Sequence, residues 1–596
     1  MLPALFVFTI TLVAAVLLIT ERLRPDLVAL LVLVVLGLSR LVTPAQTFAG
    51  FSGSAVMTIL AISIISEGLH ATGVTYWLGQ WMRRLAGQNE VRLILVTMLA
   101  SAALSLLMNN IAAVGVLLPA VMTLARQADQ PPSRLMMPLA FGTLLGGMAT
   151  LLTTSNIIVS GALKDAGYTP FGLLDFLPVG IPVIVVGVLY MLLWGRRLLP
   201  SRPSSFADVR IRHLGRNLAS MYDLEKNICY VLVLPGSFVA SQSLQEGQWY
   251  QRFGLSVVGL IHLGHLHVAP GREEIVYEGD VVVAQGNPDP EVLRYFGLRL
   301  EKPTLPFKVV DESVVLAEVV LSPHTTLVGS SLREIHFREK YGFNVLAIWR
   351  EGTSLQEGLP DLPLRFGDAL LAQGPALRLR MLRDDRDFIV LEEDPDPVLN
   401  PRRARAALVI TLLTLAIAST GWLPVAQVAF AGAILMLLVG SLGMEDAYRS
   451  IEWKAIFVIA GMWPLSFAIQ SSGLADLIVA AISTVFGEVS PLGLAALLLG
   501  LTLAVTQLVG GQVASLILSP LALSAALASG ADARGMGMAV ALGCSLAFLT
   551  PFGHPVNVMV MGPGGYSLRD FLRIGGPLTL LLILTILAGL HFFWGL

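Results

Sequence analysis

Two asparagines, Asn109 and Asn110, lie side by side within the apolar stretch LSLLMNNIAAVGVLLP. A side-chain amide moved from water into an apolar environment without a hydrogen-bond partner costs roughly 2–7 kcal/mol. In a membrane such amides often form hydrogen bonds between helices, but amide oxygens are also ligands for hard cations. Because the two amides are adjacent and basic residues flank the stretch at Arg92 and Arg126, we favour a site for an ion and an anion.

Two further apolar stretches are interrupted by polar residues, glycine and proline: GGMATLLTTSN from Gly146 and FLTPFGHPVN from Phe548. Broken helices at membrane depth expose backbone groups that lipid cannot satisfy, so that ions, substrate or packed protein must do so. Helix N-termini at a break favour an anion, and unwound carbonyls with amide or hydroxyl oxygens suit a cation. The candidate binding residues at the two breaks are Thr150, Thr153, Thr154, Ser155 and Asn156, and Thr550, Gly553, His554 and Asn557.

His554 has two interpretations. An imidazole changes its charge near neutral pH, so that this side chain either carries a coupling proton or bonds neighbouring backbone. Charged residues near the ends of other apolar stretches are expected at the water-exposed edge of the membrane: Glu67, His70, Glu445, Asp446, Glu452 and Lys454.

The composition is that of a protein that crosses a membrane many times. Of its 596 residues, 55% are hydrophobic and 13% are charged, and the mean hydropathy is +0.74. These values exclude an ordinary soluble globular protein. A net charge of −2 gives no indication of nucleic acid as a partner. No Walker loop, nucleophile–His constellation or plausible carboxylate pair occurs, so neither an enzyme nor an organic cofactor is predicted.

Charge divides the chain into apolar ends and a charged centre rich in β-formers. Basic clusters mark both junctions, GRRLLPSR from Gly195 and PRRAR from Pro401. Because basic residues beside spans favour the cytoplasmic side, residues 203–396 are predicted to be cytoplasmic. The predicted divisions are a first membrane repeat at 1–198, small domains at 203–301 and 305–396, and a second membrane repeat at 403–596.

The two apolar ends resemble each other at a nearly constant offset. Gly73 corresponds to Gly473, and Asn156 corresponds to Asn557. The arginine distribution gives each half about five crossings and one re-entrant hairpin, at 91–125 and about 491–530. Five is odd, so the second half is predicted to be inverted relative to the first. Inverted repeats with interrupted helices are typical of secondary transporters.

The chain resembles the divalent anion–sodium symporter family of the ion transporter superfamily. Three stretches carry this resemblance: the hairpin stretch, the TTSN break and FLTPFGHPVNVMVMGPGGYSLRDF. The resemblance covers both membrane halves. It implies a polytopic homodimer in the inner membrane of a bacterium. It also implies transport of sulfate, dicarboxylates or related small anions with Na⁺ by an elevator mechanism. Possible Na⁺ ligands are then Asn109, Asn110, Asn156, Gln512 and Asn557.

The chain departs from the Ser-Asn-Thr signature of that family at both hairpins. The first hairpin has Asn109-Asn110-Ile111, and the second has Gly510-Gly511-Gln512. Glycine still offers backbone groups, and Gln512 offers an amide oxygen. These changes keep open a transporter coupled to H⁺, a transporter of another oxyanion, and a membrane-anchored ligand sensor that does not transport.

The charged centre contains a second duplication with an offset of 88: YEGDVVVAQG, with Gly279, matches RFGDALLAQG, with Gly367. Each copy is predicted to form a strand, a short helix that Gly342 ends in the second copy, two strands around a turn, and a final strand after Gly-Asp. The copies resemble the TrkA-C (RCK-C) domain, which implies a small effector as ligand. His262, His265 and His267 are interpreted as exposed hairpin residues rather than metal ligands, because His262 aligns with Arg350.

Overall fold

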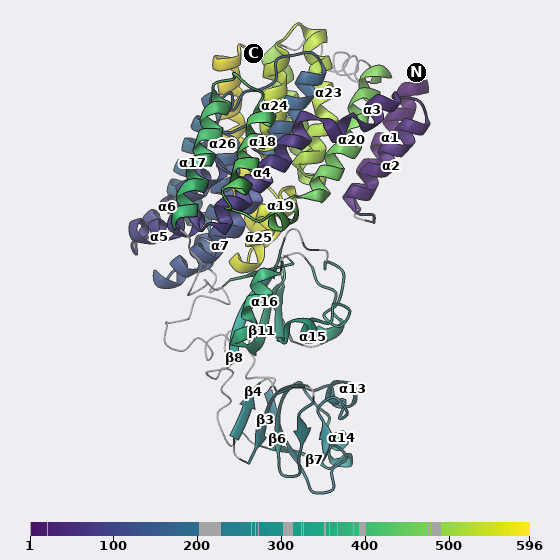
Figure 1. The fold of residues 1–596 in the computed structure, drawn as a ribbon, viewed down its shortest axis with the longest axis vertical. Coiled ribbons are helices and arrows are strands. Elements are labelled where there is room, and N and C mark those ends of the chain that lie inside the picture. Colours follow the sequence, from purple (N-terminus) through teal and green to yellow (C-terminus); the bar gives the residue numbers. More distant parts are fainter. Residues whose placement is uncertain are drawn as a thin grey trace.

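The computed structural model describes residues 2–596 except for 21, 202–227, 264, 269, 272, 302–313, 323, 324, 326, 351, 352, 357, 366, 386, 392–400, 475, 476 and 478–489. A body of packed helices stands above two small mixed α/β modules that follow each other along its long axis (Figure 1). The predicted limits at 203, 305 and 396 fall outside the described residues.

The first apolar segment forms short, closely spaced helices. Proline stands at the first turn of α2, and a reciprocal Thr43–Gln46 capping box starts α3, so local sequence signals fix several helix starts. The helices are α1 Leu2–Ile19, α2 Pro25–Leu38, α3 Pro44–Phe48, η1 Ala49–Ser52, α4 Ser54–Ala71, α5 Val74–Ala86, α6 Glu90–Ser105, α7 Asn110–Gln127, η2 Pro132–Arg134, α8 Met136–Gly147, α9 Thr154–Asp165, α10 Leu177–Tyr190, η3 Met191–Gly195 and α11 Arg196–Leu198.

The second apolar segment gives a similar series. Its helices are α17 Pro401–Ser419, α18 Val425–Leu438, α19 Met444–Ser450, α20 Trp453–Ser471, α22 Pro491–Val509, α23 Gly511–Ser529, α24 Ala533–Ser545, η7 Pro551–Gly553, α25 Pro555–Gly564 and α26 Leu568–Trp594. The pairs α2/α18, α6/α22, α7/α23 and α9/α25 begin 400 or 401 residues apart.

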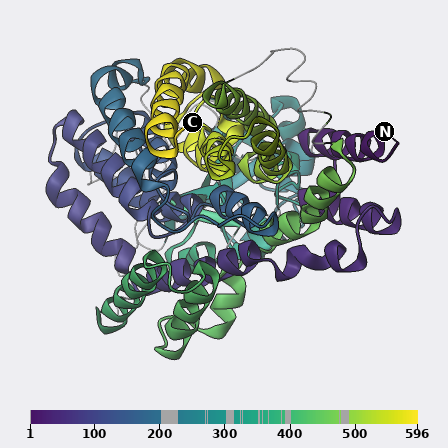
Figure 2. The same ribbon diagram turned by 90° about the horizontal axis from the view of Figure 1, so that it is seen from above.

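The two series pack on each other reciprocally. Helix α2 packs on α20, while α18 packs on α4. Likewise α23 packs on α9, and α7 packs on α25. Seen from above, the purple-to-blue helices of the first segment and the green-to-yellow helices of the second form one interleaved body (Figure 2). Each broken segment is therefore supported by a helix from the other half.

The described residues contain five helices that are long and apolar enough to cross a membrane, namely Pro44–Ala71, Leu177–Leu198, Trp453–Ser471, Pro491–Val509 and Leu568–Trp594. Several shorter apolar helices accompany them, among them α2 and α18. This content agrees with a polytopic helical membrane protein.

The charged centre folds into two modules with the same sheet topology. The first has sheet order β4-β3-β6-β1-β7 and the second β10-β9-β11-β8-β12, all antiparallel. The first contains β1 Ile228–Val233, β2 Gln242–Ser243, α13 Trp249–Phe253, β3 Ser256–His262, β4 His265–Val268, β5 Ile275–Val276, β6 Val281–Gln285, α14 Pro290–Tyr295 and β7 Leu298–Glu301. The second contains β8 Val314–Leu321, α15 Phe337–Tyr341, β9 Asn344–Arg350, β10 Thr353–Leu355, η5 Leu359–Asp361, β11 Ala369–Pro375, η6 Ala376–Arg378, α16 Leu379–Asp384 and β12 Phe388–Val390.

The predicted short helix of these modules is confirmed, whereas the predicted last strand of each module is wrong. Gly342, with φ +76°, ends α15 as predicted. The strand after Gly-Asp is not the last, because a helix and an edge strand follow it in each module: α14 with β7, and α16 with β12. These edge strands pair with β1 and β8, so that their pairing depends on long-range contacts rather than on local pattern.

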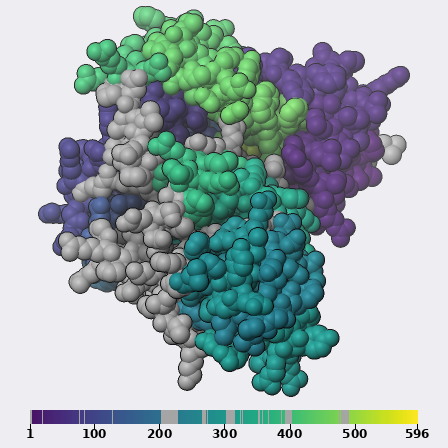
Figure 3. Space-filling model, turned by 60° about the horizontal axis from the view of Figure 1, so that its bottom comes forward, coloured from purple at the N-terminus to yellow at the C-terminus, as the bar shows by residue number. Residues whose placement is uncertain are grey.

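The two sheets pack face to face. Tyr230, Val258 and Val283 of the first form one apolar cluster with Leu346 and Leu371 of the second. The opposite face of each sheet is covered by the module's own helices. In the space-filling view the second module lies between the first module and the helical body (Figure 3).

Candidate functional site

The first broken segment lies between α8 and α9 and is held together by Asn156. The Nδ2 group of this side chain donates to the carbonyl oxygen of Thr150 at 2.7 Å and to that of Gly147 at 3.4 Å. The Thr153 hydroxyl donates to the same Gly147 carbonyl. Asn156 is fully buried, and its Oδ1 has no hydrogen-bond partner among the described residues. A buried acceptor is thus left free at the break.

The second broken segment lies between α24 and α25 and repeats this arrangement around Asn557. Its Nδ2 donates to the carbonyl oxygens of Ala547 at 2.6 Å and Thr550 at 3.1 Å. Asn557 is also fully buried, and within the described part of the chain its Oδ1 likewise has no partner. Buried polar atoms in native proteins are normally paired, so two equivalent free amide oxygens point to groups that bind there.

The first hairpin tip touches the first break. A methyl group built on Gly147 would lie 2.6 Å from Asn110 Oδ1, so only glycine leaves room for this amide. Ser105 Oγ donates to Asn110 Oδ1 at 2.5 Å. Asn109 caps α7, because its Oδ1 accepts the Ala112 N–H at 2.7 Å. The candidate residues Asn110 and Asn156 are therefore brought together at Gly147.

Asn109 also reaches the other half of the chain. Its Nδ2 donates to Glu452 Oε1 at 2.7 Å, at the start of α20. The sequence interpretation placed Glu452 at the membrane edge and gave it no contact with the hairpin. The separation of 343 residues explains why local pattern did not indicate this bond.

The second hairpin tip is built from backbone. Gly510 has φ +82°, a conformation that favours glycine. A methyl group on Gly511 would lie 2.5 Å from the Cys544 carbonyl oxygen and 3.0 Å from Ser155 Oγ. The second tip therefore packs on the end of α24 and on the first break, and its close approach accounts for glycine where the resembling family has side chains.

Gln507, in the last turn of α22, was not among the predicted site residues. Its Nε2 donates to the Leu546 carbonyl oxygen at 3.0 Å, and its Oε1 accepts the Thr550 hydroxyl at 3.0 Å. Thr550 Oγ1 in turn accepts the Gly553 N–H at 3.0 Å. A polar side chain in an apolar helix, three residues before the Gly-Gly tip, was the available signal.

The remaining candidates either form local hydrogen bonds or, among the described residues, form no side-chain hydrogen bond to the breaks. His554 Nδ1 accepts the Val556 N–H at 3.2 Å and caps α25, which is the backbone hydrogen bond of its second interpretation. Thr150 Oγ1 accepts the Leu152 N–H at 3.2 Å. For Thr154 and Gln512, the described part of the chain gives no side-chain hydrogen bond to either break.

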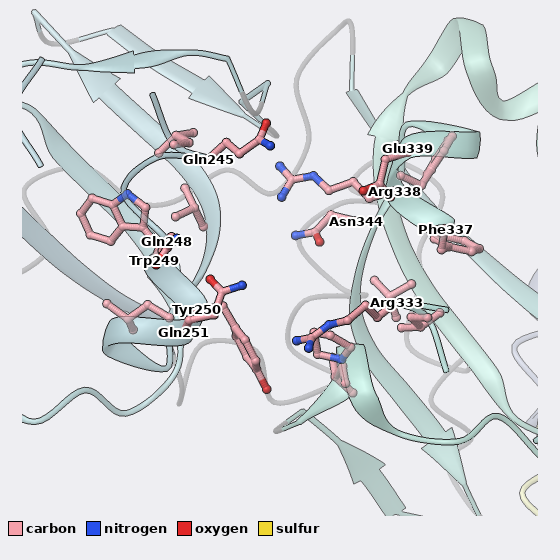
Figure 4. A pocket seen from close by; sticks show the side chains of 18 residues that line it. Gln245, Gln248, Trp249, Tyr250, Gln251, Arg333, Phe337, Arg338, Glu339 and Asn344 are labelled. Atoms are coloured by element: carbon pink, nitrogen blue, oxygen red, sulfur yellow. The ribbon is translucent and has the colours of Figure 1, made fainter. Parts of the chain in front are cut away.

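A cleft of about 360 Å³ lies between the two modules. Arg333, Arg338 and Asn344 of the second module face Gln245 and Gln251 of the first across it (Figure 4). Many of its lining residues correspond at the offset of 88, such as the pairs Trp249/Phe337 and Leu255/Phe343.

Helix α15, which supplies part of the cleft wall, is fixed from behind. Lys340 Nζ and the Tyr341 hydroxyl donate to Asp385 Oδ2 at 3.0 and 2.7 Å. Burial raises the pKa of Tyr341 to about 12, so the hydroxyl stays protonated as a donor.

The histidines of the first module bind carboxylates. His262 Nδ1 lies 2.7 Å from Asp280 Oδ1, and His267 Nδ1 lies 3.1 Å from Glu274 Oε1. The side chain of His265 is outside the described set. Among the residues that the structure describes, no group of three potential metal ligands occurs.

Comparison with known proteins defines the class. The family described as citrate transporter (CitMHS) matches residues 15–543, most of the chain. The chain belongs to this family and is a membrane transporter. Its homologues are transporters rather than enzymes.

Individual relatives extend over nearly the whole sequence. The uncharacterized transporter YfbS of Escherichia coli is 32% identical over 592 residues, which cover 97% of both chains. A protein of Chlamydomonas reinhardtii named as a putative sulfur deprivation response regulator is 26% identical, with 89% of this chain and 92% of that one covered. A probable sodium/sulfate cotransporter 3 from the same alga is 22% identical, with 90% and 82% covered.

Proposed function

We propose that the chain is a secondary active transporter of a small divalent anion, of the sulfate or dicarboxylate class, coupled to Na⁺. The observation that carries this proposal is the pair of buried, unpartnered amide oxygens of Asn156 and Asn557 at two equivalent helix breaks. Each break lies against a hairpin tip, the first at Asn110 and the second near Gln507. The sodium/sulfate cotransporter relative supports the choice of ion and anion.

The two kinds of ligand would use different groups. An anion fits the N-terminal end of α9, which no side chain caps, and the helix dipoles of α9 and α25 both favour negative charge at these ends. A cation fits the amide oxygens of Asn156 and Asn557 and neighbouring backbone carbonyls, since hard cations take oxygen ligands. Bound Na⁺ would neutralise part of the anion's charge, which gives a physical reason for coupled binding.

The fold supports an inverted-repeat arrangement as part of the same proposal. Corresponding helices begin 400 or 401 residues apart and pack reciprocally across the two halves. We propose that α6–α7 and α22–α23 are the two re-entrant hairpins, that the protein is a homodimer in a bacterial inner membrane, and that it moves by an elevator mechanism. The divisions 1–198, 203–301, 305–396 and 403–596 belong to this proposal.

For the modules we propose TrkA-C-like effector binding on the cytoplasmic side. The cleft between them is lined by the guanidinium groups of Arg333 and Arg338, by several side-chain amides and by apolar side chains. Guanidinium and amide donors fit an organic anion rich in acceptor oxygens. The cleft volume of about 360 Å³ lies within the range of small-molecule sites.

Uptake into proteoliposomes tests the proposed function. Labelled sulfate, succinate and citrate would each be offered under an inward Na⁺ gradient, an inward H⁺ gradient, or neither. The proposal expects one of these anions to accumulate with Na⁺ alone. Accumulation with H⁺ alone would contradict Na⁺ coupling.

A second candidate is a membrane-anchored sensor that does not transport. The backbone-only tip at Gly510 and Gly511 and the relative named as a putative regulator favour it. Saturable binding of sulfate without uptake under any gradient would support this sensor function and exclude transport.

A further inference from the structure

The second module touches the helix that carries Asn557. A methyl group built on Gly562 of α25 would lie 2.3 Å from the carbonyl oxygen of Gly367, which is in the module's Gly-Asp turn. From the other side, a methyl on Gly367 would lie 3.8 Å from the carbonyl oxygen of Val558, the residue after Asn557. Backbone therefore meets backbone, and glycine at position 562 is what permits the contact.

An apolar row across the module's sheet extends this contact. Trp349, Ala369, Val320 and Ile389 are neighbours in register on four adjacent strands. Ala369 and Val320 are buried within the same apolar cluster as the membrane helices, and Trp349 and Ile389 pack against it. The first module has a corresponding row of neighbours, but its last member is the charged Arg299: Ile261, Val281, Leu232 and Arg299. The second module is thus the one with an apolar edge toward the helices.

The turn at Gly367 is held in a fixed shape. Asp368 accepts hydrogen bonds from Arg350 Nε at 2.8 Å and Nη2 at 2.6 Å, and from the backbone N–H of Arg365 at 2.8 Å. The Asp368 side chain is 1% exposed, so this is a buried bidentate pair. A rigid turn transmits a displacement of its module directly to whatever it touches.

Helix α25 joins that turn to the candidate site. Asn557 and the capping His554 lie at its N-terminal end, while Gly562 lies near its C-terminal end. Just beyond the helix, the Tyr566 hydroxyl donates to the Ser133 carbonyl oxygen at 2.6 Å and accepts the Met137 N–H at 2.8 Å. The counterpart helix α9 packs instead on α4, α23 and α24.

We propose that the second module is an intramolecular brake on α25: its Gly367 turn, docked at Gly562, restrains the movement of the broken helix that carries Asn557. This inference rests on the proposed transport function. Because the modules share one packed interface, a ligand bound in the cleft between them would shift this restraint.

Gly562→Ala tests the brake, with Gly576→Ala as its matched control. Both are helical glycines followed by proline, but a methyl on Gly576 of α26 meets nothing within 4 Å. Hydrogen exchange of the purified full-length protein reports the contact directly, and uptake in proteoliposomes reports its effect. We expect Gly562→Ala to raise exchange in both α25 and the strand after Gly367 at least about threefold, and to raise maximal uptake at least about twofold, with Gly576→Ala unchanged in both.

The two readouts separate the possible failures. Unchanged exchange in Gly562→Ala would show that the turn is not docked in solution and would overturn the brake. Raised exchange with unchanged or lowered uptake would overturn it as well, since the contact then either has no effect or supports transport. If the parent protein takes up no anion at all, the proposed transport function fails, and the exchange result still decides whether the turn is docked.

Discussion

The broken segments before α9 and before α25 have nearly the same internal hydrogen bonds but different contacts with the rest of the protein. In both, a fully buried asparagine donates to two carbonyls of the unwound chain and keeps its Oδ1 free of partners among the described residues. Outside, the first meets the Asn110 amide and the Gly511 backbone, whereas the second meets Gln507 and bears a helix that touches a module.

This difference separates two kinds of feature. What both segments possess belongs to the function that each half must supply, which we take to be binding of an ion and an anion. What one segment alone possesses is free to tune that function. We therefore expect Gln507 and the Gly367 contact to affect the specificity or the control of the second segment.

The largest effect is expected at the shared feature. Asn156→Ala or Asn557→Ala leaves unwound carbonyls without a donor, a loss of about 2 kcal/mol, and removes the proposed cation ligand. By the tenfold change per about 1.4 kcal/mol, uptake should fall about 30-fold or more in each variant. Asn89→Ala is the control, because Asn89 is exposed and only caps α6 through Val91 N–H. A large loss at one break and none at the other would refute their equivalence.

A smaller effect is expected at Gln507, which corresponds to Leu106 in the first half at the offset of 401. Gln507→Leu makes the second segment like the first, while it removes the bonds to Leu546 and Thr550. We expect about a tenfold loss of uptake with a changed ranking among sulfate, succinate and citrate. A uniform loss for all three anions would show a structural role only.

The smallest effect on uptake is expected from the turns of the two modules. Asp368→Asn weakens the pair with Arg350 in the turn that touches α25. Asp280→Asn weakens the equivalent pair with His262 in the first module, where a methyl group built on Gly279 would meet nothing within 4 Å. Both variants should lower the apparent melting temperature, because each replaces a buried carboxylate that accepts several hydrogen bonds. Only Asp368→Asn should change maximal uptake, by about two- to threefold. Equal changes in uptake would place the control elsewhere.

The sequence indicated where the helix breaks lie, but it did not indicate the contacts that surround them. Asn156 and Asn557 stood out because polar residues interrupt apolar runs at positions 401 apart, which is visible without any structure. The bond from Asn109 to Glu452 and the role of Gln507 depend on tertiary packing between helices far apart in sequence. Gly511 was interpreted as a position that lacks the side-chain ligand of the resembling family but still offers backbone groups, and its close approach to Cys544 and Ser155 adds a packing reason for glycine.

The modules teach the same lesson. Their internal repeat and the helix end at Gly342 were readable from glycine positions and strand alternation. The edge strands β7 and β12 were not, because short strands are defined by the partner with which they pair. The docking of Gly367 on Gly562 joins residues 195 apart in number, and neither glycine carries a side chain that would signal a contact.

Ligand-dependent thermal stability tests the central claim most directly. The full-length protein would be heated with and without sulfate, succinate or citrate, in NaCl and in KCl, beside Asn557→Ala. A ligand at about 100 times its Kd stabilises the folded state by roughly 2.7 kcal/mol. We predict that one anion raises the melting temperature by several degrees in Na⁺ only, and that Asn557→Ala abolishes the shift. An equal shift in K⁺, an unchanged shift in Asn557→Ala, or no shift with any anion would contradict a Na⁺-coupled anion site at the broken helices.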